Sequence, residues 1–459
     1  MSREAAIAVH RFGLGARPGE IDLAASRPKE WLLAQLSGPA DQPVPLDGAP
    51  LMTGAALVAD LLAYQKMQAR LRQQGAAAQD PVRQFFKNRV AIYNKEMQAR
   101  FALGFTTTRP FAERLVRFWS NHFVVSAQNP RATTLVGAFE REAIRPNIHK
   151  TFEAMLVAVV THPAMLLYLD NAQSIGPDSI AGMRTGKGLN ENLGRELMEL
   201  YTLGVDGGYT QADVTALAKL LTGWTLDRRS VGSTGAIFFD RIHEPGPITL
   251  RGKSYPQGEE GTMSAIRDLA HDPATARHVA RKLATHFIAD NPPPDACAGI
   301  ERRFVSTGGD LVAVADAVLG EREAWSNALG KMRTPVEYVT AAFRFLGWPR
   351  GGDQQKQTQG ALAAARLMGE APLGAPAPKG WPDTSDAWSG PNAVLNRIEW
   401  AREVGSRMPA SLGVDAAVSS AVGVLGPLFN SATESVMRAA SSGGEAVALL
   451  IASPEFQRR

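Results

Sequence analysis

Apolar residues recur at helical spacing along most of the chain. After Pro28, which suits the first turn of a helix, they continue at three- and four-residue intervals to Leu36. Thr108-Arg109-Pro110 starts another such run. Further helices are expected over about 52–74, 81–104, 131–145, 151–161, 163–169, 191–203, 211–222, 261–271, 274–289, 310–320, 335–346, 356–368, 391–407 and 442–452. The pattern therefore predicts an all-α protein with a large multi-helix domain.

Three stretches break this pattern. Residues 171–189 are rich in Gly and Ser and long enough for a functional loop, and residues 370–390 are dense in Pro and Gly. Within 235–257, the apolar runs 236–239 and 248–250 flank a turn-forming segment, which predicts a small inserted β-hairpin at about 235–250.

A chain of 459 residues exceeds the roughly 250–300 at which single hydrophobic cores stop growing. We therefore expect one large domain that divides into two helical lobes, over about 1–230 and 231–459.

The charge balance argues against a nucleic-acid partner. The chain has 49 Lys and Arg against 45 Asp and Glu, a net charge of +4, and its short Arg clusters alternate with acids. No apolar run approaches the roughly 20 residues that a membrane-spanning helix needs. We expect a soluble protein with no nucleic-acid partner and no membrane span.

One cysteine, Cys297, excludes an intrachain disulfide and a cysteine-based metal site. The first ten residues lack the apolar core of a signal peptide. The expected location is the cytoplasm, with export on a signal-bearing partner as the alternative.

Residues 190–224 are the most distinctive stretch, NENLGRELMELYTLGVDGGYTQADVTALAKLLTGW. Asn190 suits an N-cap, and Leu193, Leu197 and Leu200 form the apolar side of the helix that follows. Asn192, Glu196 and Glu199 share another face, since they lie three or four residues apart. Thr210 and Asp213 resemble a capping box for the next helix.

This stretch resembles the signature of the bacterial "domain of unknown function 1800" family. Further segments along the chain resemble the same family. They are Arg11-Phe12-Gly13-Leu14-Gly15, residues 118–123 (FWSNHF), residues 162–171 (HPAMLLYLDN), Lys282-Leu283 with His286-Phe287, Gly380-Trp381-Pro382 and Ser453-Pro454-Glu455-Phe456. The resemblance covers essentially the whole chain.

The resemblance implies little about activity, because the family is uncharacterised. It does imply a partner, since members are often encoded beside a protein of a sulfatase-like family. Many relatives also carry an export signal, and none is expected here because residues 1–10 have no apolar core. Relatives tend to have a lysine near Ile248, and this chain has none there, so no role of that lysine carries over.

The first functional hypothesis is an enzyme, either a metal-assisted hydrolase or an oxidase. Two carboxylates one turn apart on a helix are how helical metal sites begin, usually with a histidine from another element. The expected catalytic residues are Glu196, Glu199, Arg195 and His122, and a divalent metal would take its ligands from Glu196, Glu199 and His243.

Further binding residues are expected around the same face and its loop: Asn121, Asp170, Asn171, Glu191, Asn192, Trp224 and His243. Each has a structural alternative. The acids and Arg195 can form helix ion pairs, the histidines can bond backbone carbonyls, and the tryptophan can lie in the core.

The second hypothesis is a non-enzymatic partner or scaffold for the sulfatase-like protein. In that case the polar signature serves only to fix the packing of its helices.

Overall fold

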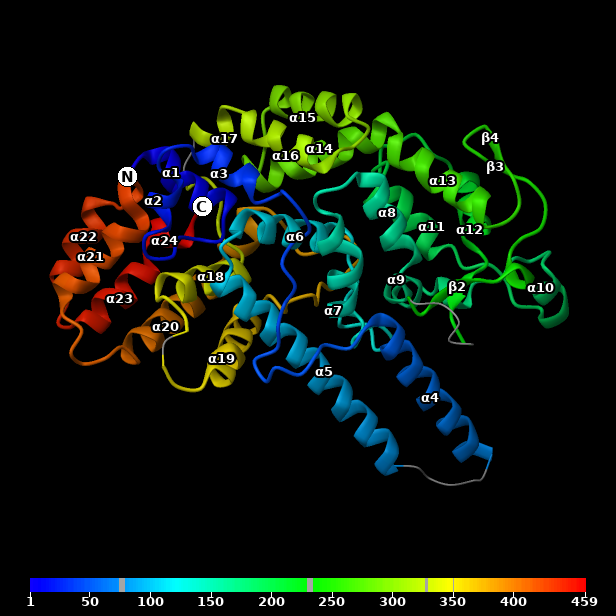
Figure 1. Ribbon diagram of the computed structural model, residues 1–459, viewed down its shortest axis with the longest axis horizontal. Coiled ribbons are helices and arrows are strands. Elements are labelled where there is room, and N and C mark those ends of the chain that lie inside the picture. Colours follow the sequence, from blue (N-terminus) through cyan, green and yellow to red (C-terminus); the bar gives the residue numbers. More distant parts are fainter. Residues whose placement is uncertain (74–78, 229–233, 327–328, 350) are drawn as a thin grey trace.

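The computed structural model describes residues 1–73, 79–228, 234–326, 329–349 and 351–459 (Figure 1). Helices dominate both halves. Those of the first half are α1 (Arg3–Ile7), η1 (Ala8–Phe12), α2 (Glu20–Ala24), α3 (Pro28–Ala34), α4 (Gly54–Gln73), α5 (Gln79–Thr106), α6 (Pro110–His122), α7 (Val136–Phe139), η2 (Glu140–Ile144), η3 (Arg145–Asn147), α8 (Phe152–Thr161), α9 (Pro163–Tyr168), η4 (Asn171–Gln173), α10 (Ile180–Thr185), α11 (Asn192–Glu196), η5 (Leu197–Tyr201) and α12 (Gln211–Leu221).

The helices of the second half continue the same architecture. They are η6 (Asp240–Ile242), α13 (Glu259–His271), α14 (Pro273–Phe287), α15 (Pro294–Ser306), α16 (Leu311–Gly320), α17 (Glu323–Ser326), α18 (Pro335–Phe345), α19 (Gln354–Leu367), η7 (Ser385–Trp388), α20 (Pro391–Ser406), α21 (Val414–Leu425), η8 (Gly426–Leu428), α22 (Ser431–Arg438), α23 (Gly443–Ala452) and α24 (Pro454–Gln457). The all-α prediction is confirmed.

The helices begin where the local sequence favours a start. Pro110, Pro273 and Pro335 each occupy a first turn, where a missing amide hydrogen costs nothing. The predicted capping box of Thr210 and Asp213 is present at α12. Asn190 caps less directly than expected: the helix starts after Glu191, and the Asn190 side chain accepts from the Asn192 amide at 2.9 Å.

The two predicted strands, 236–239 and 248–250, are present as β2 and β3, but each pairs with a strand that was not predicted. β2 (Ala236–Phe238) pairs with β1 (Trp224–Leu226), and β3 (Ile248–Leu250) pairs with β4 (Lys253–Tyr255), both antiparallel. The expected pairing of 236–239 with 248–250 is therefore wrong. The turn at Arg251-Gly252, with both residues at positive φ, makes β4 the nearer partner for β3.

Helices that are far apart in the sequence pack against one another. α20 and α23 pack together at one end, α8 and α13 at the other, and α5 lies against α18 and α19 (Figure 1). α6 runs through the middle and is buried over most of its length. The last residue returns to this centre: the Arg459 amide donates to Lys331 O at 2.8 Å, and the Lys331 amide donates to Arg459 O.

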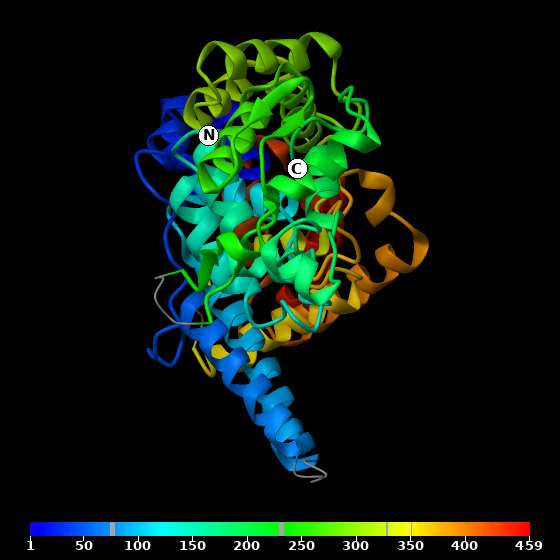
Figure 2. The same ribbon diagram turned by 90° about the vertical axis from the view of Figure 1, so that its right-hand side faces the viewer.

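α4 and α5 form an arm that projects from the body (Figure 2). The expected helix over about 52–74 is observed to Gln73, and its last residue lies outside the described part of the chain. In the described ranges, no helix is both long and apolar enough to cross a membrane.

Both long Gly- or Pro-rich stretches are largely irregular. η4 and α10 interrupt residues 171–189, and η7 interrupts residues 370–390. Residues 370–390 lie against the body: the Trp381 amide donates to Asn121 Oδ1, and Asn121 Nδ2 donates to Trp381 O, at 2.8 and 2.9 Å.

Candidate functional site

The signature helix begins as α11 and continues directly as the π-helical turn η5. Leu193, Leu197 and Tyr201 are buried along its inner side. The polar side carries the predicted acids. Burial, followed by the charge of Glu199, raises the pKa of Glu196. Glu196 and Glu199 are both half-buried, whereas Asn192 is exposed.

Glu191 and Arg195 form the helix ion pair that was the structural alternative, with 3.0 Å between Glu191 Oε2 and Arg195 Nη2. Glu191 also accepts from Thr215 Oγ1 at 2.6 Å and from Gln211 Nε2 at 2.9 Å. These contacts tie the signature helix to α12. Arg195 is thus engaged with neighbouring side chains.

The other predicted residues of this region hold the loops together. His243 is buried, and its Nδ1 donates to Thr222 O at 2.7 Å while its Nε2 accepts from the Gly258 amide at 2.9 Å. Neither ring nitrogen is left for a metal. Across the described ranges, no three His, Cys, Asp or Glu side chains form a group that could hold a metal ion. The predicted set of Glu196, Glu199 and His243 is therefore not assembled.

Asp170 and Asn171 lie at the start of the 171–189 loop. Asp170 forms an ion pair with Arg131. Asn171 is buried, and its Nδ2 donates to Leu221 O and Trp224 O. The half-buried Trp224 packs edge-to-face on Phe238, with ring centroids 5.8 Å apart. In these contacts Asp170, Asn171 and Trp224 hold neighbouring parts of the structure together.

His122 lies elsewhere, at the end of α6. It is buried, and its Nε2 donates to Tyr201 O at 3.1 Å. This bond fixes the tautomer, so Nδ1 carries a lone pair, and Nδ1 has no hydrogen-bond partner among the described residues. Burial holds the pKa of His122 well below its usual value, so the ring is neutral.

His122 and Asn121 line a cavity of about 380 Å³ between α6, α14, the start of α18 and residues 370–384. We call it the α6–α14 cavity. Apolar side chains form much of its wall: Phe118, Val124, Val125, Val336, Leu373 and Trp381. Its polar residues include Lys282 and His286 from one face of α14, and Glu370 and Asp383 from the irregular stretch.

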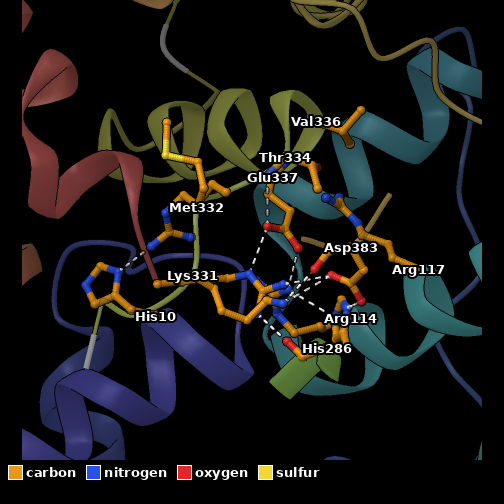
Figure 3. A network of polar contacts seen from close by, with 12 residues as sticks. His10, Arg114, Arg117, His286, Lys331, Met332, Thr334, Val336, Glu337 and Asp383 are labelled. Atoms are coloured by element: carbon orange, nitrogen blue, oxygen red, sulfur yellow. Dashed lines mark hydrogen bonds and ion pairs between the residues drawn. The ribbon is translucent and has the colours of Figure 1, made fainter. Parts of the chain in front are cut away.

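Glu337, His286 and Asp383, which line the cavity, belong to a buried ionic network (Figure 3). Glu337 is held between two arginines, with Oε1 2.5 Å from Arg114 Nη1 and Oε2 2.9 Å from Arg459 Nε. Although burial alone would raise it, the pKa of Glu337 falls well below its usual value because both guanidinium groups face it. The acid is therefore an anion neutralised inside the protein.

His286 and Asp383 form the second part of the network (Figure 3). His286 Nδ1 lies 2.6 Å from Asp383 Oδ2. Burial lowers the pKa of His286 to about 4. Burial opposes ionisation of Asp383, yet His286, Lys331 and Arg459 together lower its pKa to about 2. Glu337 and Asp383, the two acids of the network, are therefore both negatively charged, and each has a cationic or hydrogen-bonding neighbour.

Lys282 is not part of this network. Its side chain lines the cavity, and it makes no hydrogen bond or ion pair with any residue in the described ranges. Burial lowers its pKa to about 8.

Glu370 also lines the cavity, and it is buried. Its Oε2 accepts from the Val336 amide at 2.8 Å. Burial nevertheless raises its pKa to about 7, so it exchanges a proton near neutral pH.

A family model described as a protein of unknown function, DUF1800, matches residues 7–458. The chain belongs to the DUF1800 family. No curated protein and no solved structure matches it. The predicted family membership is thus confirmed over nearly the whole chain.

Three of the DUF1800-like segments meet at the α6–α14 cavity: residues 118–123, the Lys282–Phe287 segment and Gly380-Trp381-Pro382. None of residues 190–224 lines the cavity, but Tyr201 supports its wall: its carbonyl accepts from His122, and its hydroxyl donates to Val124 O. The cavity was not predicted from the sequence. Lys282 and His286 belonged to a segment of the resemblance, but their helical spacing alone indicated an ordinary amphipathic helix.

Proposed function

We propose that this DUF1800 protein binds a small anionic molecule in the α6–α14 cavity, with Lys282 as its main charged contact. One observation carries the proposal: Lys282 lines the cavity, and its side chain makes no hydrogen bond or ion pair with any described residue. The side chain of Lys282 is half-buried, and the charge of Asp383 offsets only part of the cost of its burial, so a bound anion would stabilise the ammonium group further.

The balance of charge around the cavity supports an anion. Glu337 and Asp383 are already neutralised by Arg114, Arg459 and their neighbours. Lys379 adds an exposed cation at the rim. Lys282 and Lys379 are therefore the lining cations that form no ion pair with a described acid, and they favour an anionic occupant.

The size and walls support a small organic molecule. A volume of about 380 Å³ lies within the roughly 300–1,000 Å³ of ordinary ligand sites, which combine apolar walls with a few polar groups. The Nδ1 lone pair of His122 suits a ligand hydroxyl or amide donor. Together with Glu370 it also supplies the groups that proton transfer to a bound molecule would use.

The test is titration calorimetry with inorganic phosphate, sulfate, pyruvate and succinate. We expect at least one of these anions to bind, and Lys282→Met to weaken its binding by about tenfold or more, the loss of one buried charge contact. Arg281→Met removes an exposed cation from the neighbouring position of α14 and should leave affinity unchanged.

Unchanged affinity in Lys282→Met, or no binding of any of the four anions, would refute the proposal. Equal losses in both variants would point to nonspecific electrostatics and refute it as well.

A second candidate is acid–base chemistry at Glu196, favoured by the raised pKa of its carboxyl group beside Glu199. Metal assistance at that face, as hydrolase or oxidase, would need ligands beyond the two acids. Glu196→Gln, assayed for activity beside Lys282→Met, separates the two candidate sites. The sulfatase-like partner stays a prediction, tested by co-purification.

A further inference from the structure

The arm formed by α4 and α5 extends well beyond the helices that anchor it (Figures 1 and 2). Leu62 on α4 and Tyr93 on α5 are buried at its base. Further out, the rings of Tyr64 and Phe85 stack with centroids 3.5 Å apart and join the two helices. At 1.5 Å per residue, the 28-residue α5 alone is about 42 Å long.

The positive charge of the protein is concentrated on this arm. Residues 61–94 carry six basic residues and one acid, Asp80. The rest of the chain then has 43 Lys and Arg against 44 Asp and Glu, which nearly cancel. The six basic residues are Lys66, Arg70, Arg72, Arg83, Lys87 and Arg89, of which all but Arg89 are exposed.

The arm also exposes apolar side chains. Phe86 is 51% exposed and Val90 57% exposed. They lie one turn apart on α5, so they share a face. The exposed cation Arg83 precedes Phe86 by three residues, and the exposed Lys87 follows it directly. Exposed apolar residues bordered by Lys and Arg are typical of helices that lie on a membrane surface.

We propose that this arm docks the protein onto an anionic lipid bilayer. The Lys and Arg side chains contact lipid phosphates, and Phe86 and Val90 enter the boundary between headgroups and acyl chains. Pairing of two copies through their arms would bring like charges together. A nucleic-acid backbone would match the charge but offers no apolar surface for Phe86 and Val90.

The experiment is flotation of the full-length protein with vesicles of equimolar phosphatidylcholine and phosphatidylglycerol, and with vesicles of phosphatidylcholine alone. We expect binding to the anionic vesicles only, weakening as NaCl is raised. The quadruple variant Lys66→Glu, Arg70→Glu, Arg83→Glu, Lys87→Glu should bind at least about a thousandfold more weakly, since each of the four basic residues contributes about 1 kcal/mol near such a surface.

The matched control reverses four exposed arginines of the body: Arg3, Arg27, Arg184 and Arg402. It changes the net charge equally and should keep most of the binding. Phe86→Ser with Val90→Ser should weaken binding but retain its salt dependence. Circular dichroism checks that each variant is folded.

Equal loss in the arm and body variants would overturn the proposal, since net charge alone would then explain binding. Failure of the wild type to bind anionic vesicles would also overturn it and would leave the arm to an acidic protein partner. Anion binding in the α6–α14 cavity is measured without lipid, so the two proposals fail independently.

Discussion

Glu337 shows how single residues support the cavity. It is buried between Arg114 and Arg459, and each guanidinium group also bonds a backbone carbonyl: Arg114 Nε donates to Gly13 O, and Arg459 Nη1 donates to His286 O. Through these bonds, the triad of Arg114, Glu337 and Arg459 connects the start of the chain at Gly13 with its middle and its end. Buried ion pairs add little net stability, but removing one partner is costly because the other charge is left unpaired.

Glu337→Gln should therefore lower the free energy of unfolding by about 3–5 kcal/mol, measured by urea denaturation. The exposed Glu399→Gln is the matched control and should change it by less than about 0.5 kcal/mol. Similar small effects in both variants would show that the triad is not a stabilising centre.

Glu370 makes stability depend on pH. Its pKa is raised to about 7 in the folded protein from an ordinary value near 4.5, so the folded state holds a proton that the unfolded chain has lost. Stability should fall as pH rises through this window. Between about pH 5 and 8, Glu370→Gln should gain about 2–3 kcal/mol relative to the wild type in urea denaturation. A constant difference between the two proteins would contradict this reading.

Lys282 makes ligand binding depend on pH in a related way. Its pKa is about 8 without ligand, and only the protonated amine attracts an anion. Affinity should be constant below this value and fall by about tenfold per pH unit above it. Calorimetry of an anion that does not itself titrate in this range, such as sulfate, measures the effect. Lys282→Met should show no such decline, and a wild-type affinity independent of pH would contradict the role of Lys282.

Among the elements, the segment around Gly380 fixes the width of the cavity. Gly380 has a φ of +86°, and a Cβ there would lie 2.4 Å from Asn121 O. The close approach allows the paired hydrogen bonds between Asn121 and Trp381. A side chain at this position would push the irregular stretch away from α6.

Gly380→Ala should therefore destabilise the protein and weaken anion binding, in thermal melts and calorimetry. Gly369→Ala is the control, because Gly369 also has positive φ, +99°, but a Cβ there meets nothing within 4 Å. It should cost only about 1–2 kcal/mol of backbone strain and leave affinity unchanged. Equal effects on binding would show that the contact with Asn121 does not shape the cavity.

Elements that depend on local sequence were predictable, and those that depend on distant pairing were not. α12 and α14 follow from caps, prolines and apolar spacing within a few residues. The strands 236–238 and 248–250 were located correctly, but their partners depend on the turn at 251–252 and on a connection back to residue 224.

At the scale of the whole molecule, the cavity exists because the fold brings together α6, α14 and residues 370–384, which are far apart in the sequence. No local pattern distinguishes Lys282 from the many other lysines and arginines on amphipathic helices. His122 was selected from the sequence and does line the cavity, whereas His243 proved to be held by backbone groups. The distinction rests on contacts that only the fold creates.

The most direct test of the central claim is to locate an anion in a crystal of the protein. Soaking with selenate and collecting anomalous diffraction data would mark each bound anion by its selenium. The proposal predicts a selenium peak inside the α6–α14 cavity, within hydrogen-bonding reach of Lys282 Nζ, that is lost in Lys282→Met. Selenate bound only at the molecular surface, with the cavity holding none, would contradict it.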